Sequence, residues 1–439
     1  MSAVPPASPP PASPASVPAS AAAPAGGPSG RPLRPVVWKF GGSSVGDMDR
    51  LRRVAQRLVD ARRAGADVVA VLSAMSDTTD DLLEMANGLT TQPDARELDA
   101  LLATGESMSC ALAAIAVHEL GERAVSLNGR QAGVLTDTAH GNARMRSIDP
   151  ARIVAALEQG LIVLVTGYQG VTDDGDVTTL GRGGSDASAI AVAAALGLPA
   201  CDIWTDVPGV FTADPRVVPD ARRLDRLSHE AMLQLAEAGA QVMQPRAVEL
   251  AAAHGVAIHV RSSFTGEPGT WITEVREEHD MFETARITGV AHRRHDPLYQ
   301  VDGLTPAQVS AALAGHGLPV GSIIGSPGEL RFTSPGAEPQ SVIAALGDIG
   351  AAVAVHDEEL GSVSVAGDAC GNRSEVTLRI LESLESTGIR PVLVTSTPSR
   401  VSCHVASGAV DEAARVLHSA FGLHTDAAAP QPVGAGRAN

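Results

Sequence analysis

The stretch VVWKFGGSSVG, residues 36–46, decides the fold of this chain. A short apolar run that ends directly in two glycines is typical of a buried strand running into a tight turn. Lys39 stands just before the turn, and Ser43 and Ser44 follow it. A cation, glycines and hydroxyls gathered at the end of a strand indicate a site for an anion. Because a P-loop has its lysine after the glycines, we predict a phosphate site of another architecture.

The composition limits what the chain can be. It has 439 residues, 44% hydrophobic and 19% charged, which is enough for roughly two to four domains. The formal net charge of −17 argues against a nucleic-acid binder, because such proteins carry a basic face. No apolar run approaches the roughly 18 residues of a membrane helix, so no membrane partner is expected. The four cysteines form no CxxC pair, which argues against a zinc site or disulfides and fits a cytoplasmic setting.

The two ends of the chain are predicted to be disordered. Residues 1–34 consist almost entirely of Pro, Ala, Ser and Gly, and such a segment cannot bury enough apolar surface to fold. It lacks the continuous apolar segment of a secretory signal, and its first arginine comes late for a transit peptide. A disordered tail is predicted over residues 426–439.

Residues 35–280 are predicted to form one α/β domain. After the first strand, residues 51–59 place apolar side chains at helical spacing. Further buried strands are predicted at residues 67–74, 161–167, 201–206 and 256–262. Continuous apolar strands that alternate with helices predict a mostly parallel sheet sandwiched by helices.

The pattern changes after residue 287 into two smaller units of short strands and helices. The clearer unit, residues 358–425, has a βαββαβ-like order, which predicts a small α+β module. Its predicted elements are strands at 362–367, 391–395 and 401–405 and helices at 374–386 and 410–421. A weaker version of the same order predicts a divergent first module at residues 287–357.

A second glycine-rich stretch, TTLGRGGSDASA at residues 178–189, also indicates an anion site. Its glycines permit close approach of the backbone to a ligand, and Arg182 suits a carboxylate or phosphate. Ser185 and Asp186 begin a predicted helix, whose N-terminus favours an anion. A glycine loop with Ser185 as a simple helix cap remains an alternative. A second glycine turn elsewhere in the chain favours a functional site.

The stretch IWTDVPGVFTADPRVVPDARRLD, residues 203–225, begins as a strand and continues as an irregular, charged loop. Open α/β sheets bind ligands at the carboxyl ends of their strands, where Thr205 and Asp206 stand. Phe211 and Asp214 could then hold a base and a ribose. A plain surface loop would explain the prolines but not the Thr-Asp opening.

Two further stretches are weaker signals. Ser73 ends a predicted strand, and Thr78 and Thr79 precede a predicted helix, where hydroxyls are often only caps. Gly105 and Glu106 interrupt another helical pattern. Taken alone, Glu106 would be expected to be a solvated surface glutamate.

Together and in order, KFGGSS, SAMSDTTD, ATGE, TTLGRGGSD, WTDVPGVFTADPR and PRAVELA resemble the aspartate kinases (aspartokinases). These enzymes have an amino acid kinase fold followed by paired ACT modules. The resemblance covers about residues 36–421, specifically in the first two-thirds and loosely in the last third. It implies transfer of a phosphoryl group from ATP to L-aspartate, giving 4-phospho-L-aspartate, with Mg²⁺ bound mainly through the nucleotide phosphates. This reaction opens the route to lysine, threonine and methionine, or to ectoine.

The resemblance also implies roles for individual residues. Lys39 would neutralise the phosphates, and Asp186 would orient Lys39 and the metal–phosphate assembly, so these two form the expected catalytic pair. Glu106 would hold the substrate ammonium and Arg182 its α-carboxylate. The other implied substrate-binding residues are Ser73, Thr79, Tyr168 and Ser185. The other implied ATP-binding residues are Gly41, Gly42, Ser43, Thr205, Asp206, Phe211, Asp214 and Arg216, and no side chain is implied as a metal ligand.

Three departures from the family pattern stand out. Gln241 replaces a lysine that reaches the nucleotide in many relatives. The family's usual GF(I/Q)G motif reads GYQG here, so that Tyr168 replaces a phenylalanine in the substrate pocket. In the second module, GDACGNRSEVT at residues 367–377 replaces the usual glycine-methionine stretch. The modules imply a homodimer or higher homo-oligomer and a site for an amino-acid effector, whose identity stays open.

Two other functions stay open at this point. The first is a kinase of the same fold acting on another small acid, which Glu106 and Arg182 argue against because together they match an α-amino acid head group. The second is a non-catalytic binding protein that keeps the kinase fold. Such a protein would be expected to have lost Lys39, Arg182 or Asp186, and all three are present.

Overall fold

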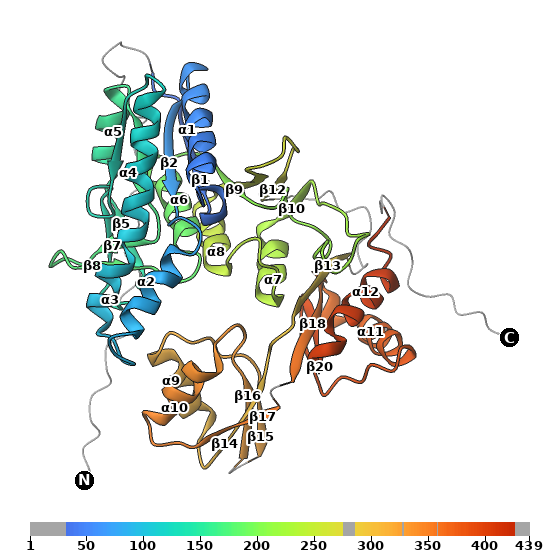
Figure 1. Ribbon diagram of the computed structural model, residues 1–439. Helices are drawn as coiled ribbons and strands as arrows, with labels where there is room; N and C mark the ends of the chain where they lie inside the picture. Colours follow the sequence, from blue (N-terminus) through green and yellow to red (C-terminus); the bar gives the residue numbers. More distant parts are fainter. Residues whose placement is uncertain (1–31, 275–285, 327–328, 358, 426–439) are drawn as a thin grey trace, which may run out of the picture.

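The computed structural model describes residues 32–274, 286–326, 329–357 and 359–425. Apart from residues 32–34, the predicted N-terminal extension lies outside the described residues, as does the predicted tail over residues 426–439. Figure 1 shows one large unit, formed by the first part of the chain, and two smaller units, formed by the last part.

The large unit is built on an eight-stranded sheet. Its strand order is β10-β12-β11-β9-β1-β2-β6-β3, and every neighbouring pair is parallel except β11 and β12. This confirms the mostly parallel sheet that the apolar runs predicted. The strands are β1 (Pro35–Phe40), β2 (Asp67–Leu72), β3 (Ala124–Leu127), β6 (Ile162–Thr166), β9 (Ala200–Thr205), β10 (Arg226–Ser228), β11 (Ala257–Ser262) and β12 (Thr270–Thr273).

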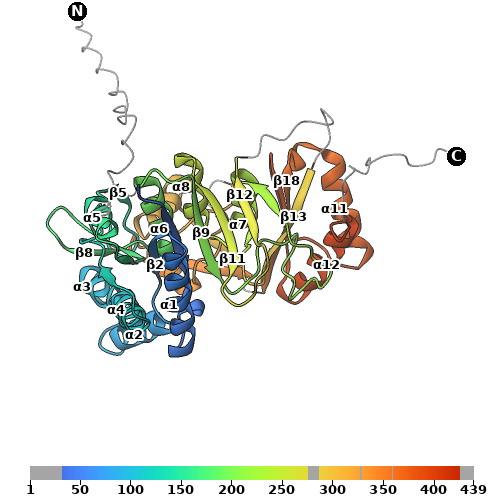
Figure 2. The same ribbon diagram turned by 90° about the horizontal axis from the view of Figure 1, so that it is seen from above.

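Helices cover both faces of this sheet (Figure 2). One face packs against α1 (Met48–Arg63) and α4 (Thr104–Glu119). The opposite face packs against α5 (Ala151–Glu158), α6 (Gly184–Ala195), α7 (His229–Ala238) and α8 (Pro245–His254).

The alternation of side chains along β1 decides which face Lys39 meets. Successive side chains of a strand point to opposite faces. Val37 belongs to the core cluster shared with α6, whereas Phe40 belongs to the cluster shared with α1. Lys39 therefore lies on the α6 face of the sheet.

Smaller elements follow β2 and β6 in the chain. They are α2 (Thr78–Asn87), α3 (Ala95–Leu102) and a four-stranded sheet of order β5-β4-β7-β8, formed by β4 (Val134–Thr136), β5 (Met145–Ile148), β7 (Gln169–Val171) and β8 (Val177–Thr179). Within the described ranges, one helical stretch, Ala95–Glu119, is long and apolar enough to cross a membrane by length and composition alone. Half of its most apolar window is buried inside the protein, and one such stretch is weak evidence for a membrane span.

The first small unit is a complete βαββαβ module. Its antiparallel sheet has the order β15-β16-β14-β17. The elements are β14 (Leu298–Asp302), α9 (Pro306–Gly315), β15 (Ile323–Ser326), β16 (Glu329–Thr333), α10 (Pro339–Gly347) and β17 (Val353–Asp357). The unit that was weaker in sequence is thus the regular one.

The second small unit takes one strand from before the first. Its antiparallel sheet has the order β13-β18-β20-β19. It contains β13 (Arg286–Arg293), β18 (Leu360–Asp368), α11 (Ser374–Ser386), β19 (Leu393–Thr397), β20 (Arg400–Ala406) and α12 (Val410–Ala420). This arrangement does not follow the order of the chain, because the edge strand β13 precedes the first module whereas its partner β18 follows it.

The expected assignment of residues 287–293 to the first module is therefore wrong. Strand β13 pairs with β18, with Arg293 opposite Ser362, and the Asp296 N–H donates to the Leu360 carbonyl over 2.9 Å. The first module is inserted between two neighbouring strands of the second. The other domain boundaries remain predictions.

This nesting predicts that the first module can be removed without unfolding the rest. Replacing residues 298–357 with a short Gly-Ser linker should keep β13 paired with β18, because neighbouring strands lie only about 4.8 Å apart. The melting temperature of the shortened protein should stay within about 5 °C of the intact chain. Truncation after residue 357 is the matched control, and it should aggregate because it removes the partner of β13. Aggregation of the linker variant as well would contradict the nested arrangement.

Candidate functional site

Lys39 and Asp186 form a buried ion pair at the carboxyl end of β1. The Lys39 Nζ lies 2.6 Å from the Asp186 Oδ1, and only 9% and 7% of the two residues are exposed. Asp186 stands in the first turn of α6, which is the helix on the face that Lys39 meets. Lys39 is also the only lysine in the chain, in which arginine is the other strongly basic residue.

The glycine turn after β1 packs tightly on two neighbouring strands. The Gly41 N–H donates to the Trp204 carbonyl of β9 over 3.2 Å, and the Ser76 N–H donates to the Gly42 carbonyl over 3.3 Å. A Cβ at Gly42 would lie 3.0 Å from the Ala74 carbonyl oxygen, and one at Gly41 would lie 3.4 Å from the Lys39 Nζ. The glycines therefore leave the space around the lysine ammonium open.

Glu106 is buried against the end of β2. It is 3% exposed, and its Oε1 accepts a 3.1 Å hydrogen bond from the Ala74 N–H. A Cβ at Gly105 would lie 2.9 Å from the Ala74 Cβ, so glycine allows α4 to approach this closely. The simple expectation of a solvated surface glutamate is therefore wrong.

The second carboxylate oxygen of Glu106 is left without a partner among the described residues. Within the described part of the chain, Glu106 Oε2 is buried and has no hydrogen-bond partner. Burial raises the pKa of Glu106 to about 7, although the Ala74 N–H opposes this shift. A buried carboxylate without a partner is costly, and a ligand cation would relieve that cost.

The second glycine-rich stretch forms the turn into α6. Gly181 and Gly183 both have φ +72°, which favours glycine, and Gly183 is the N-cap of α6. Ser185 is buried in the first turn, where a Cβ at Gly167 would lie 2.6 Å from its Oγ. Arg182 lies between the two glycines and is exposed. Among the residues described, it makes no hydrogen bond or ion pair, so its guanidinium is available to an anion.

Tyr168 is held in place by residues that the sequence did not single out. Its φ of +67° is unusual for a side chain of this size, and its carbonyl accepts from the Leu180 N–H over 2.8 Å. Burial raises the pKa of Tyr168, and the nearby Thr179 hydroxyl opposes this shift. The Thr179 hydroxyl donates in turn to the carboxylate of Asp99.

Asp99 organises one wall of the site. It is 1% exposed and accepts hydrogen bonds from His140 Nδ1 over 2.8 Å, from the Gly141 N–H over 3.0 Å and from Thr179. In the sequence, Asp99 stands three residues before Leu102, a spacing that places both on one side of a helix. Asp99 thereby joins α3, the loop around His140 and β8.

The charged loop after β9 is divided between two environments. The Thr205 hydroxyl donates to Asp206 over 3.0 Å at the end of β9, directly after Trp204, whose carbonyl accepts from the glycine turn. Further along, Arg216 donates to both oxygens of Asp214, the closest contact being 2.7 Å. Burial opposes ionisation of Asp214, but the hydrogen bonds from Arg216 outweigh it and lower the pKa. Phe211 is half-buried and pairs with Arg223 through the backbone.

Most of the predicted site residues are joined by direct contacts. Ser73 follows β2 and donates its N–H to the Phe40 carbonyl over 3.1 Å, while Ser43 accepts from Arg50 over 2.9 Å. Thr79 is half-buried in the first turn of α2. The structure brings together the carboxyl ends of β1, β2 and β6 with the start of α6, and so connects Lys39, Gly41, Gly42, Ser43, Ser73, Glu106, Tyr168, Ser185 and Asp186.

Other predicted residues do not join this connected set directly. Phe211, Asp214 and Arg216 lie on a segment that packs against the second small unit. Gln241 is exposed in the turn between α7 and α8. In the described residues, no group of three or more His, Cys, Asp or Glu side chains could hold a metal ion.

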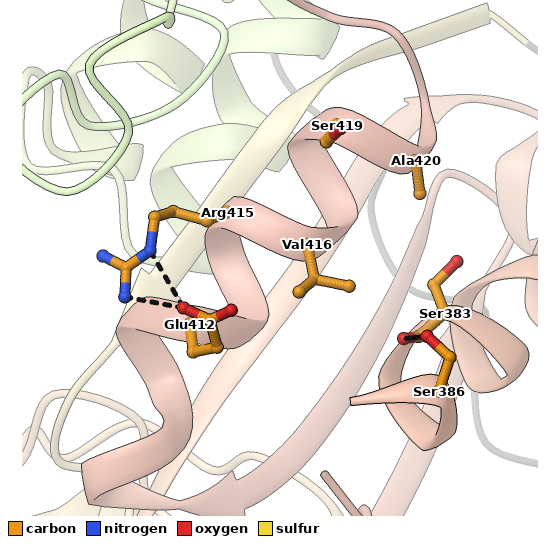
Figure 3. A pocket seen from close by; sticks show the side chains of 7 residues that line it. All are labelled: Ser383, Ser386, Glu412, Arg415, Val416, Ser419 and Ala420. Carbon is orange, nitrogen blue, oxygen red and sulfur yellow. Dashed lines mark hydrogen bonds and ion pairs between the residues drawn. The ribbon is translucent and has the colours of Figure 1, made fainter. Parts of the chain in front are cut away.

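A hollow of about 410 Å³ lies away from this site, between α11 and α12 (Figure 3). Arg415 and Glu412 form an ion pair of 2.8 Å along one side of it. None of the predicted site residues lines it, so it is separate from the site at the large sheet. Its lining residues are Ser383, Ser386, Glu412, Arg415, Val416, Ser419 and Ala420.

Comparison with known proteins points to one family. The sequence profile of the amino acid kinase family matches residues 34–262. An aspartokinase of Mycolicibacterium smegmatis is 44% identical over 420 residues, which cover 92% of this chain and 99% of that protein. Among solved structures, E. coli aspartokinase III in complex with aspartate and ADP matches with a TM-score of 0.68 and 26% identity, covering 88% of this chain and 99% of that one. The same enzyme in complex with lysine and aspartate matches with a TM-score of 0.65 and 25% identity, covering 88% and 98%.

The buried Glu106 predicts a distinctive dependence of stability on pH. Its pKa rises from an ordinary 4.5 to about 7 in the folded state, so the folded chain binds more protons than the unfolded chain between these values. The stability that Glu106 contributes is therefore present below pH 4.5 and lost as the pH rises through 7. Between pH 4.5 and 8, Glu106→Gln should gain about 3 kcal/mol relative to the natural chain.

Thermal melting of both proteins at pH 5 and pH 8 checks this prediction. Glu119→Gln, at the exposed end of the same helix, is the matched control and should show no such gain. An equal difference between Glu106→Gln and the natural chain at the two pH values would contradict the raised pKa.

Proposed function

The chain belongs to the aspartokinases of the amino acid kinase family, and from this premise we propose how its own residues carry the reaction. An aspartate kinase transfers the γ-phosphoryl group of ATP to the side-chain carboxylate of L-aspartate and gives 4-phospho-L-aspartate and ADP. Little covalent help is needed for phosphoryl transfer, so positioning and electrostatics should supply most of the rate.

The observation that carries the proposal is the buried Lys39–Asp186 pair beside the glycine turn. Lys39 is a compact point charge, suited to phosphate oxygens that gain negative charge in the transition state. Asp186 holds the ammonium on the α6 face until the nucleotide arrives. Gly41, Gly42 and Ser43 shape the turn, whose missing side chains leave room for phosphates beside the Nζ.

The substrate amino acid is proposed to bind between Glu106 and Arg182. The unpartnered Oε2 of Glu106 would accept a hydrogen bond from the α-ammonium group. The guanidinium of Arg182 would pair with the α-carboxylate. The substrate side chain then points toward Lys39. The wall of the pocket is assigned to Ser73, Thr79, Tyr168 and Ser185.

The nucleotide is proposed to extend from Lys39 toward the loop after β9. Thr205 and Asp206 would border it near the sheet, and Phe211, Asp214 and Arg216 would border it farther out. Because Gly41 has no Cβ, no side chain covers the Lys39 ammonium on that side, where a phosphate oxygen would approach. Mg²⁺ would be held mainly by phosphate oxygens and would neutralise part of their charge. Asp186 is the acidic side chain nearest to Lys39 and would orient that assembly.

Regulation and assembly are proposed on the same basis. The solved E. coli aspartokinase III complex contains lysine, and we infer that the small modules of this chain offer a site for an amino-acid effector. We also propose a homodimer or higher homo-oligomer in the cytoplasm, at the first step of the route to lysine, threonine and methionine or ectoine.

Substitution of Lys39 tests the catalytic proposal. Lys39→Ala should lower turnover at least about 1,000-fold in a hydroxamate assay with ATP, Mg²⁺ and L-aspartate, because it removes the charge that meets the transferring group. The substitution also leaves Asp186 buried without its partner, which destabilises proteins. The double variant Lys39→Ala/Asp186→Asn therefore separates the two effects. A folded double variant with near-normal turnover would refute the role of Lys39.

The unpartnered Oε2 of Glu106 predicts that its loss weakens the binding of aspartate but not that of ATP. Glu106→Gln should raise the KM for aspartate about 10- to 100-fold, the loss expected for a charged hydrogen bond, and leave the KM for ATP unchanged. In the natural enzyme the KM for aspartate should rise as the pH falls from 8 to 6, because Glu106 takes up a proton near pH 7. Glu119→Gln is the control. An equal rise in both KM values would exclude a specific ammonium site.

A further inference from the structure

Residues 210–224 form an irregular hairpin that leaves the large unit and returns to it. The arms are joined by the Thr212 N–H donating to the Arg222 carbonyl and the Leu224 N–H donating to the Val210 carbonyl, each over 2.8 Å. At the base, the Val210 N–H donates to Thr270 Oγ1 of β12 over 2.9 Å. The hairpin carries three of the residues proposed to border the nucleotide.

The tip of the hairpin is buried in the second small module. Ala213, Val217 and Val218 are each at most 5% exposed. They belong to the same buried cluster as Val290 of β13 and Leu417 of α12. Removal of this apolar surface from water fixes the tip against the module. The base of the hairpin is therefore built by one unit and its tip by another.

Hydrogen bonds from the module reinforce this contact. The Val290 N–H of β13 donates to the Thr212 carbonyl over 2.8 Å, and a Cβ at Gly289 would lie 2.7 Å from that same oxygen. From α12, Arg415 donates to the Val217 carbonyl over 3.4 Å. Figure 3 shows this arginine projecting from α12 beside Glu412.

One side-chain contact joins the hairpin to α12 in a fully buried setting. Thr212 Oγ1 lies 2.9 Å from His418 Nε2, and the two residues are 1% and 2% exposed. The same Oγ1 accepts the Arg222 N–H over 3.0 Å, so the hydroxyl hydrogen is best satisfied by donating to His418. Burial, with the nearby charge of His424, lowers the pKa of His418, which keeps the imidazole neutral and able to accept.

We propose that His418 is a positioning residue for ATP: by accepting the Thr212 hydroxyl, α12 of the second module holds the hairpin 210–224 in the shape that borders the nucleotide. The inference rests on the proposed nucleotide role of Phe211, Asp214 and Arg216. It implies that the second module sets the affinity for ATP, whereas the aspartate pocket is built by the large unit alone.

The test compares steady-state kinetics of single variants in the full-length chain. His418→Ala should raise the KM for ATP about 5- to 20-fold, the range expected for loss of a buried hydrogen bond, with kcat and the KM for aspartate changed less than about twofold. His418→Gln, whose side-chain oxygen can accept the same bond, should restore most of the affinity. His254→Ala is the matched control, because this histidine is exposed at the end of α8 and, within the described ranges, has no contact with His418.

Arg216→Ala, measured in parallel, separates this inference from the proposed function. If Arg216→Ala raises the KM for ATP and His418→Ala does not, the positioning role is overturned while the nucleotide role of the hairpin stands. If neither raises it, the nucleotide role of the hairpin fails and the inference fails with it. A fall in kcat at unchanged KM for ATP, without rescue by glutamine, would show a merely structural role. Should His418→Ala not fold, Thr212→Val removes the same bond from the other side and must raise the KM for ATP.

Discussion

The site depends on burying one ammonium group beside one carboxylate at the end of a parallel sheet. A buried ion pair is costly to dehydrate and is maintained only where the geometry is good. Here the alternation of β1 sends Lys39 to the α6 face, and the left-handed Gly183 starts α6 where Asp186 can meet it. The glycine turn, the start of α6 and the neighbouring strand β9 all lie around this ion pair. Lys39 is also the only lysine in the chain.

The two small modules meet the large unit at two different loops of the candidate site. The second module buries the hairpin tip and contacts Thr212 through His418. The first module approaches Asn142, where a Cβ at Gly317 would lie 2.9 Å from the side-chain nitrogen. The oxygen of the same side chain would lie 2.9 Å from a Cβ at Gly181, beside Arg182. These contacts place one module beside the loop proposed to border the nucleotide and the other beside the loop proposed to bind the substrate.

The sequence predicted five of the eight strands of the large sheet, namely β1, β2, β6, β9 and β11, because each is a mostly apolar run. The predicted strands at 36–40 and 256–262 differ from β1 and β11 by one residue at one end. The helix predicted at 374–386 coincides with α11. The assignment of residues 287–293 failed because it depends on a contact between distant parts of the chain. Strand β13 pairs with β18, which lies beyond an inserted module, and no local sequence pattern indicates that pairing. Local patterning also could not show that Glu106 is buried, because burial there depends on Gly105 letting α4 reach Ala74.

Within the site, residues at the ends of strands were predictable, and those supporting them were not. Lys39, Arg182 and Asp186 stand in glycine-rich motifs that indicate an anion site, whereas Ser73 lay in a weaker signal and was assigned only through the family resemblance. Asp99 supports Tyr168 through Thr179 across elements far apart in the chain, and such contacts are set by tertiary packing. His418 is similarly silent in the sequence, since it is one histidine on an amphipathic helix.

The most direct test uses the single lysine itself. Labelling the chain with lysine carrying ¹⁵N at Nζ gives one side-chain signal, because Lys39 is the only lysine. The account predicts that this signal shifts on addition of a non-hydrolysable ATP analogue with Mg²⁺ and stays unchanged on addition of adenosine, which lacks phosphates. A signal that ignores the triphosphate, in protein shown by another method to bind it, would contradict the claim that Lys39 meets the nucleotide phosphates.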